Sequence, residues 1–226
     1  MSWIHFPQAL RRHRPRAPEA LVVLLHDLGV SAAALTPVAA RWAATVPTAA
    51  FNALDGIGQL DGLVSDTSID VSMDGNPTVL DSATWNLAAL IEQELRSYRL
   101  DAKRLVMVGF GYGGTLALHL LLHRGWNCAG VLAFAAQVVR PLPRILKIDC
   151  KVRLIDRRAD GQTDHGILRD KVALLTARGI DTRGVLLSGS SLSDEIIRHG
   201  GAYLAELVAT AQRGDGFNVG RENSHA

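Results

Sequence analysis

Apolar residues follow two different periods along this chain. Residues 21–25 are apolar without interruption, which is typical of a short strand buried on both faces of a sheet. Residues 79–98 instead repeat apolar positions every three or four residues, which predicts an amphipathic helix. The apolar stripe of that helix consists of Leu80, Trp85, Leu87, Leu90, Ile91 and Leu95.

The two patterns alternate over most of the chain. They predict strands at residues 21–26, 48–51, 104–108, 129–135, 152–155 and 183–187. They predict helices at residues 36–44, 79–98, 115–122, 165–178 and 193–211. Residues 53–78 are rich in Gly, Asp and Ser and are expected to form a loop. Alternation of this kind predicts an α/β fold, with a mostly parallel central sheet covered by helices on both faces.

The length of 226 residues suits a single domain with one core. We expect an N-terminal segment at residues 1–20 and the domain at residues 21–211. The polar residues 212–226 are expected to be a disordered tail. No internal repeat is visible in the sequence.

Composition and charge narrow the candidate partners. The formal net charge of +2 favours neither nucleic acid nor a membrane surface. No stretch is long and apolar enough to span a bilayer, and the first six residues lack the order of a signal peptide. The expected location is therefore the cytoplasm. The basic run at residues 11–16 is broken by Pro15 and is expected to be a solvated segment, with an electrostatic contact to a partner as the alternative.

Cys128 and Cys150 are the two cysteines of the chain. Their number and spacing suit neither a disulfide scaffold nor a metal site, so no metal and no cofactor are expected. Each precedes a predicted strand by one or two residues, and those strands are candidates for neighbours in the sheet. A bridge between them is geometrically conceivable, although free thiols are the rule in the cytosol.

The candidate chemistry lies in a Gly-rich turn between a predicted strand and a predicted helix. Such a turn is the setting of the nucleophile elbow Gly-x-Ser-x-Gly, in which small flanking residues let strand and helix nearly touch. The flanking glycines are present here as Gly109, Gly113 and Gly114. The central position, however, is Gly111, so the nucleophilic hydroxyl is missing.

Four segments resemble the phospholipase/carboxylesterase family of α/β-hydrolases, which includes acyl-protein thioesterases. Residues 24–29 (Leu-Leu-His-Asp-Leu-Gly) resemble its Leu-His-Gly-x-Gly turn, and residues 108–114 resemble its Gly-Phe-Ser-Gln-Gly-Gly elbow. Residues 152–160 resemble the strand and turn that carry the family's triad aspartate. Residues 189–192 resemble the segment that carries its triad histidine. The resemblance extends from about residue 21 to residue 208 and implies an α/β-hydrolase fold.

The resemblance places the three triad positions at Gly111, Asp160 and Ser190, of which only the aspartate is of the family's type. It implies an oxyanion hole formed by the backbone N–H groups of Leu28 and Tyr112, which survive any change of side chain. Asp27 stands where the family has glycine. A carboxylate there is expected to weaken anion binding by like-charge repulsion.

The missing serine and histidine predict a non-catalytic descendant, because the serine attacks while the histidine removes its proton. Candidate partners are an unidentified protein, an acyl-type small molecule in the old cleft, or a second copy of the chain. A working carboxylic-ester hydrolase with relocated chemistry is the alternative. A dinucleotide-binding protein is the remote one, because Gly109, Gly111 and Gly114 also match the pattern Gly-x-Gly-x-x-Gly. Against it, no acidic residue ends the next predicted strand.

The other polar candidates have plain structural explanations. Asp160 precedes Gly161, and Asp-Gly is a common turn pair. His26 follows a buried strand and is expected to be a structural histidine beside the cleft. His165 opens a predicted helix and is the candidate for a relocated base, whereas His199 lies within a helix and is expected to be structural.

Overall fold

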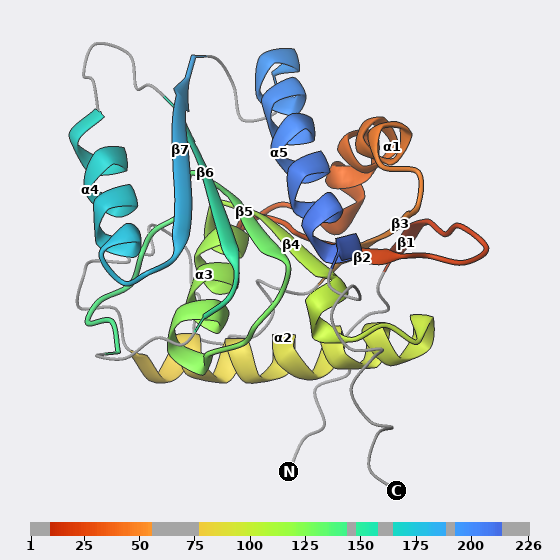
Figure 1. Ribbon diagram of the computed structural model, residues 1–226, viewed down its shortest axis with the longest axis horizontal. Coiled ribbons are helices and arrows are strands. Elements are labelled where there is room, and N and C mark those ends of the chain that lie inside the picture. Colours follow the sequence, from red (N-terminus) through yellow and green to blue (C-terminus); the bar gives the residue numbers. More distant parts are fainter. Residues whose placement is uncertain (1–9, 56–76, 144–147, 158–164, 189–192, 214–226) are drawn as a thin grey trace, which may run out of the picture.

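The computed structural model describes residues 10–55, 77–143, 148–157, 165–188 and 193–213. Within those ranges the chain forms a seven-stranded sheet in the order β1-β3-β2-β4-β5-β6-β7 (Figure 1). The strands are β1 (Leu10–His13), β2 (Ala20–Leu25), β3 (Ala49–Leu54), β4 (Leu105–Phe110), β5 (Gly130–Phe134), β6 (Lys151–Arg157) and β7 (Asp181–Leu187). The helices are α1 (Thr36–Thr45), α2 (Pro77–Tyr98), α3 (Tyr112–Arg124), α4 (His165–Thr176) and α5 (Asp194–Arg213). Two short 3₁₀ helices cover Ala32–Leu35 and Ala102–Arg104.

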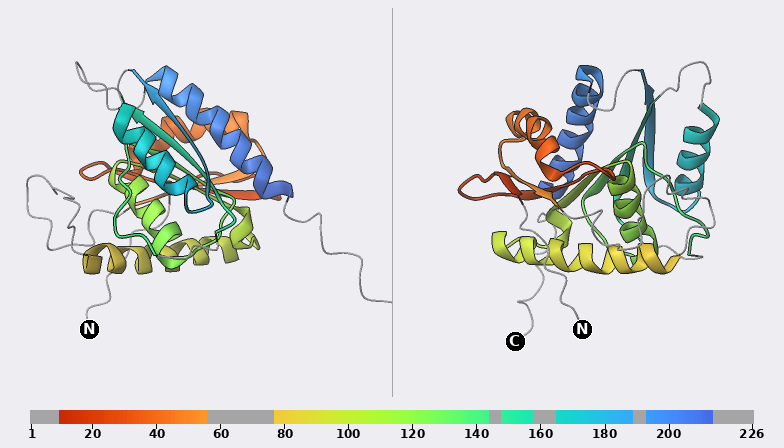
Figure 2. Two further views of the ribbon diagram at one scale, coloured as in Figure 1. Left: turned by 60° about the vertical axis from the view of Figure 1, so that its left-hand side comes forward. Right: turned by 180° about the vertical axis from the view of Figure 1, so that it is seen from behind.

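Six of these strands are parallel, and only β1 runs antiparallel to its neighbour β3. Helices α1 and α5 cover one face of the sheet, while α2, α3 and α4 cover the other (Figure 2). This arrangement confirms the predicted α/β fold. Every predicted strand and helix is present, most of them with ends within three residues of the prediction.

The alternation of side chains along each strand separates the core into two layers. In β2, Leu21, Val23 and Leu25 point to the layer under α2, α3 and α4. The intervening Val22 and Leu24 point to the layer under α1 and α5. All five are fully buried, which explains why this strand is apolar without interruption.

Strand β1 was not predicted from the sequence, because its basic residues suggested a solvated segment. It forms the edge of the sheet, where Leu10 pairs with Ala53 and Arg11 with Asn52. An edge strand needs only one neighbour, and charged residues are common there because they discourage pairing with another chain. A charged run is therefore compatible with a strand at this one place in the sheet.

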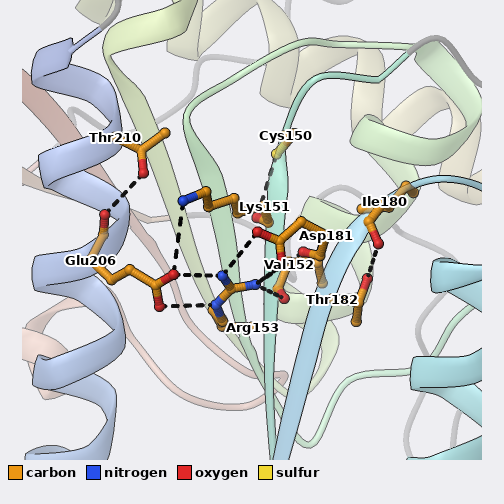
Figure 3. A network of polar contacts seen from close by, with 9 residues as sticks. All are labelled: Cys150, Lys151, Val152, Arg153, Ile180, Asp181, Thr182, Glu206 and Thr210. Carbon is orange, nitrogen blue, oxygen red and sulfur yellow. Dashed lines mark hydrogen bonds and ion pairs between the residues drawn. The ribbon is translucent and has the colours of Figure 1, made fainter.

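An ionic network surrounds one buried arginine near the amino-terminal ends of β6 and β7 (Figure 3). Arg153 of β6 is fully buried, and its guanidinium donates to both carboxylate oxygens of Glu206 on α5, at 2.6 and 3.1 Å. It also donates to both carboxylate oxygens of Asp181 on β7, at 3.1 and 3.3 Å. Hydrogen bonding to Arg153 lowers the pKa of both carboxyls below the ordinary value. The network ties α5 and β7 to β6.

The two cysteines lie close to each other at the amino-terminal ends of two strands. Cys128 and Cys150 precede the adjacent strands β5 and β6, and both are buried. Their sulfur atoms are 3.4 Å apart, and both are free thiols. The expectation that their strands are neighbours is confirmed.

Among the helices that the structure describes, none has the length and apolar character needed to cross a bilayer.

Candidate functional site

The turn between β4 and α3 is as sharp as a nucleophile elbow requires. Strand β4 ends at Phe110 and α3 begins at Tyr112, so Gly111 alone connects them. Gly111 has φ 52° and ψ −115°, a conformation that residues with a Cβ rarely adopt. Its N–H donates to the carbonyl of Phe134 on the neighbouring strand β5, at 2.8 Å.

The flanking glycines are required by close backbone contacts. A Cβ added to Gly113 would lie 2.5 Å from the carbonyl oxygen of Leu25. A Cβ added to Gly109 would overlap the backbone of Gly114. Helix α3 therefore lies directly against β4 and the end of β2, and this contact fixes the position of residue 111.

The space in front of Gly111 is occupied by the side chain of Asp27. A Cβ built on Gly111 would overlap the Cγ and both carboxylate oxygens of Asp27. The Asp27 Oδ1 atom accepts hydrogen bonds from the backbone N–H of Leu28, at 2.9 Å, and of Tyr112, at 2.8 Å. The carboxylate thus lies between the two donors that the family resemblance assigns to the oxyanion hole.

The structure brings Gly111, Asp27, Leu28 and Tyr112 together, as the sequence suggested, but with a different role for Asp27. The sequence predicts that this carboxylate repels an anion at a neighbouring site. In the structure the carboxylate itself accepts a hydrogen bond from each of the N–H groups that the resemblance assigns to that site. The interaction joins residues 85 positions apart, which is why no local pattern indicates it.

His26 contacts the loop after β2 that carries Asp27. It is buried, and its Nδ1 atom lies 2.8 Å from the carbonyl oxygen of Asp27. Its Nε2 atom lies 3.5 Å from Oδ1 of Asp55, which follows β3. Asp55 Oδ1 in turn accepts a hydrogen bond from the N–H of Ala32, at 3.3 Å. His26 therefore contacts the backbone of Asp27 and the side chain of Asp55, and its predicted structural role stays a prediction.

A cavity of about 140 Å³ opens beside Asp27 and Gly111 at the carboxyl ends of the strands. Such an edge is where open parallel sheets bind ligands. Apart from Asp27, the exposed Arg157 at the end of β6 is the one charged residue among the described residues that line this cavity. The apolar lining residues are Val30, Leu35, Phe110, Phe134, Ala135, Ile155 and Ile196.

Two of the predicted triad positions, Asp160 and Ser190, lie outside the described residues. Helix α4 begins at His165, whose side chain is outside them as well. His199 is half-buried within α5. The roles predicted for these four residues stay predictions.

The fold and the elbow define an α/β-hydrolase. A family model described as phospholipase/carboxylesterase matches residues 12–146, and the chain belongs to that family. A comparison with curated proteins finds no match.

Several solved structures share the fold. Esterase PE8 superposes with a TM-score of 0.70 at 23% identity, covering 84% of this chain and 94% of that one. A carboxylesterase from Mesorhizobium loti gives 0.66 at 21% identity, covering 83% and 88%. A phospholipase/carboxylesterase from Dyadobacter fermentans gives 0.66 at 19% identity, covering 89% and 97%. At these identities the likeness extends to the fold alone.

Proposed function

We propose that this protein is a non-catalytic member of its family that binds a small molecule in the former active-site cleft. The observation that carries the proposal is the position of the Asp27 carboxylate. It fills the space that a side chain at residue 111 would need, and it accepts a hydrogen bond from both N–H groups that the family resemblance assigns to the oxyanion hole.

Three requirements of ester hydrolysis by this family lack a counterpart in this chain, although Asp160 keeps the family's residue type at the remaining triad position. Gly111 supplies no nucleophile. The N–H groups of Leu28 and Tyr112 are already bonded to a negative group, so a tetrahedral oxyanion would have to displace it. By the family resemblance, Ser190 stands in place of the histidine that would act as base.

Binding remains chemically reasonable because the cleft has kept an apolar cavity. Its volume of about 140 Å³ is close to that of an engineered protein cavity of roughly 150 Å³ that binds benzene. The ligand is therefore expected to bury about six carbon atoms. A dinucleotide is disfavoured, since its pyrophosphate would meet the Asp27 carboxylate at the start of α3.

The direct test is turnover of a short-chain ester such as 4-nitrophenyl butyrate by the purified full chain. We expect hydrolysis near the uncatalysed rate and no effect of a serine-directed phosphonate. Turnover of about one per second or more, abolished by the phosphonate, would contradict the proposal.

Reconstruction of the active site gives the complementary test. The triple variant Gly111→Ser, Asp27→Gly, Ser190→His supplies a nucleophile, an empty oxyanion hole and a base. It is expected to gain measurable esterase activity, whereas the single variant Gly111→Ser gains none, because triad residues act as a unit. Adding Asp160→Ala to the triple variant is the control for the orienting aspartate.

A further inference from the structure

We infer that the ligand of this cleft presents a hydrogen-bond donor to Asp27, and that the chemical class it fits is a small apolar amine. The inference rests on the proposed function, because it concerns the ligand of the same cleft. The site would then present a hydrogen-bond acceptor to its ligand, where the family's site presents donors. The two N–H groups that would hold an oxyanion instead hold the Asp27 carboxylate in place.

The two oxygens of the Asp27 carboxylate have different surroundings. Oδ1 is held by two backbone N–H groups, at 2.8 and 2.9 Å. Oδ2 accepts no hydrogen bond from the residues that the structure describes, and Asp27 is an exposed residue that lines the cavity. The carboxylate is thus fixed in position while one of its oxygens is available to a ligand.

An anionic ligand is disfavoured for two reasons. It would be repelled by the negative charge of Asp27. It would also have to displace that carboxylate from Leu28 and Tyr112, and a tethered group has a far higher effective concentration than a dissolved one. A ligand with a carboxylate or phosphate head therefore gains neither donor.

An ammonium head meets the opposite situation. It would donate a charge-assisted hydrogen bond to Oδ2 without disturbing the bonds to Oδ1. Its apolar part would lie against walls that include Phe110, Phe134 and Ile196. With a cavity of about 140 Å³, benzylamine and other amines of that size are suitable probes.

Arg157 is the charged group that opposes a cationic ligand. It lines the cavity from the end of β6 and is exposed, so its charge is screened by solvent. Removing it should therefore tighten amine binding by a small factor, about threefold or less.

The test compares benzylamine, benzyl alcohol and benzoate, which share a ring and differ in the head group. Binding to the full chain is measured by chemical-shift titration. We expect benzylamine to bind about tenfold more tightly than benzyl alcohol, with benzoate weakest. Equal or tighter binding of benzoate would overturn the inference.

Variants at Asp27 make the test specific to this carboxylate. Asp27→Asn keeps the size and one acceptor oxygen but loses the charge, so the advantage of benzylamine should disappear. Asp27→Gly frees the two N–H donors, and the preference should reverse in favour of benzoate. Asp101→Asn, an exposed change beside β4 at the opposite edge of the sheet, should leave all three affinities unchanged. An unaltered amine preference in Asp27→Asn would refute the assignment.

Ester turnover measured on the same samples distinguishes failure of the proposed non-catalytic function from failure of the inferred preference for an amine. Amine binding together with rapid, phosphonate-sensitive turnover would refute the proposed function while leaving the inference intact. Absence of turnover together with no preference for amines would refute the inference alone.

The cysteine pair carries a second, independent inference. We propose that Cys128 and Cys150 form a reversible disulfide. Their sulfur atoms are 3.4 Å apart on adjacent strands, and a bond of about 2.05 Å requires only a small shift. The two thiols would lose two protons and two electrons, and an oxidant such as glutathione disulfide would be reduced to two glutathione thiols.

Burial decides the conditions for testing this bond. Hydrogen bonding to Cys128, together with burial, raises the pKa of the Cys150 thiol, so little reactive thiolate is present at neutral pH. The full chain is therefore refolded from urea with glutathione disulfide near pH 8.5. We expect a mass lower by two hydrogen atoms, no thiol that reacts after denaturation, and a melting temperature that falls when a reductant is added. Two free thiols after this treatment would overturn the proposal, and Cys128→Ser is the matched control.

Discussion

A charged side chain accepts or donates hydrogen bonds at each end of the parallel strands. The two side chains differ in how many of their polar atoms already have a hydrogen-bond partner. At the amino-terminal edge, Arg153 is fully buried and makes six hydrogen bonds from its five N–H donors. At the carboxyl ends of the strands, Asp27 is exposed, and both hydrogen bonds that its side chain accepts from the described part of the chain go to one carboxylate oxygen. A side chain whose polar atoms all have partners cannot bond a ligand as well. A side chain that is held by one oxygen can still accept a hydrogen bond from a ligand through the other. The comparison favours a structural role for Arg153 and supports the binding role that we propose for Asp27.

The largest loss of stability is expected from removing the guanidinium of Arg153. Arg153→Met leaves Asp181 and Glu206 without their shared partner and should lower the free energy of unfolding by about 3 kcal/mol. The loss falls at the lower end of the usual range because both carboxylates are partly exposed and are rehydrated in the variant. Urea denaturation measures the change. Arg96→Met removes an exposed ion pair and should cost less than 0.5 kcal/mol; similar losses in both variants would break the comparison.

A somewhat smaller loss is expected at the elbow. Gly111→Ser places a Cβ at φ 52° and in the space of the Asp27 carboxylate, which should cost about 2 kcal/mol. Adding Asp27→Gly removes the overlap and should recover part of that loss. The double-mutant cycle, measured by thermal unfolding, is expected to be non-additive. Strict additivity would mean that the serine and the carboxylate do not compete for space.

A dependence on pH should follow from the network around Arg153. The pKa of Asp181 and of Glu206 is lowered in the folded state, from ordinary values of 3.8 and 4.5. Their contribution to stability is therefore complete above about pH 5 and is lost as the pH falls through the folded-state pKa values. Glu206→Gln should flatten this acid-side loss in urea titrations, whereas Glu92→Gln, in an exposed pair, should not. Identical acid profiles for both variants would contradict the assignment.

The smallest change in the free energy of unfolding is expected from neutralising the Asp27 carboxylate. Asp27→Asn keeps an oxygen for Leu28 and Tyr112, and the side chain is exposed. The free energy of unfolding should therefore change by less than about 0.5 kcal/mol. Arg153→Lys should cost clearly more, because an ammonium cannot hold two carboxylates in bidentate geometry. A larger loss in Asp27→Asn than in Arg153→Lys would reverse the comparison.

The order of the elements was predictable because burial on both faces of a parallel sheet leaves a strong apolar signal. The strands β2 and β4 and the helix α2 follow directly from it. Strand β1 was not predictable, because its pairing partner β3 lies some 40 positions away and its own residues are basic. The sequence offered the strands after Cys128 and Cys150 only as candidates for neighbours, and the structure supplies both their pairing and the short distance between the sulfur atoms.

The site was predictable in its backbone and less so in its side chains. Three glycines around residue 111 identified the elbow, because each is required by a close contact that any side chain would block. The family resemblance gave the positions of Leu28 and Tyr112. The placement of the Asp27 carboxylate depends on how two loops meet in space. No local propensity encodes that meeting.

The overlap between residue 111 and Asp27 also links the two positions in any further change of this sequence. A Cβ at position 111 and the Asp27 carboxylate in its present position would occupy the same volume. A serine at position 111 would therefore require the Asp27 side chain to leave the N–H groups of Leu28 and Tyr112. Reversion of the elbow is thus a change at two positions, one of which lies 85 residues away from its partner N–H.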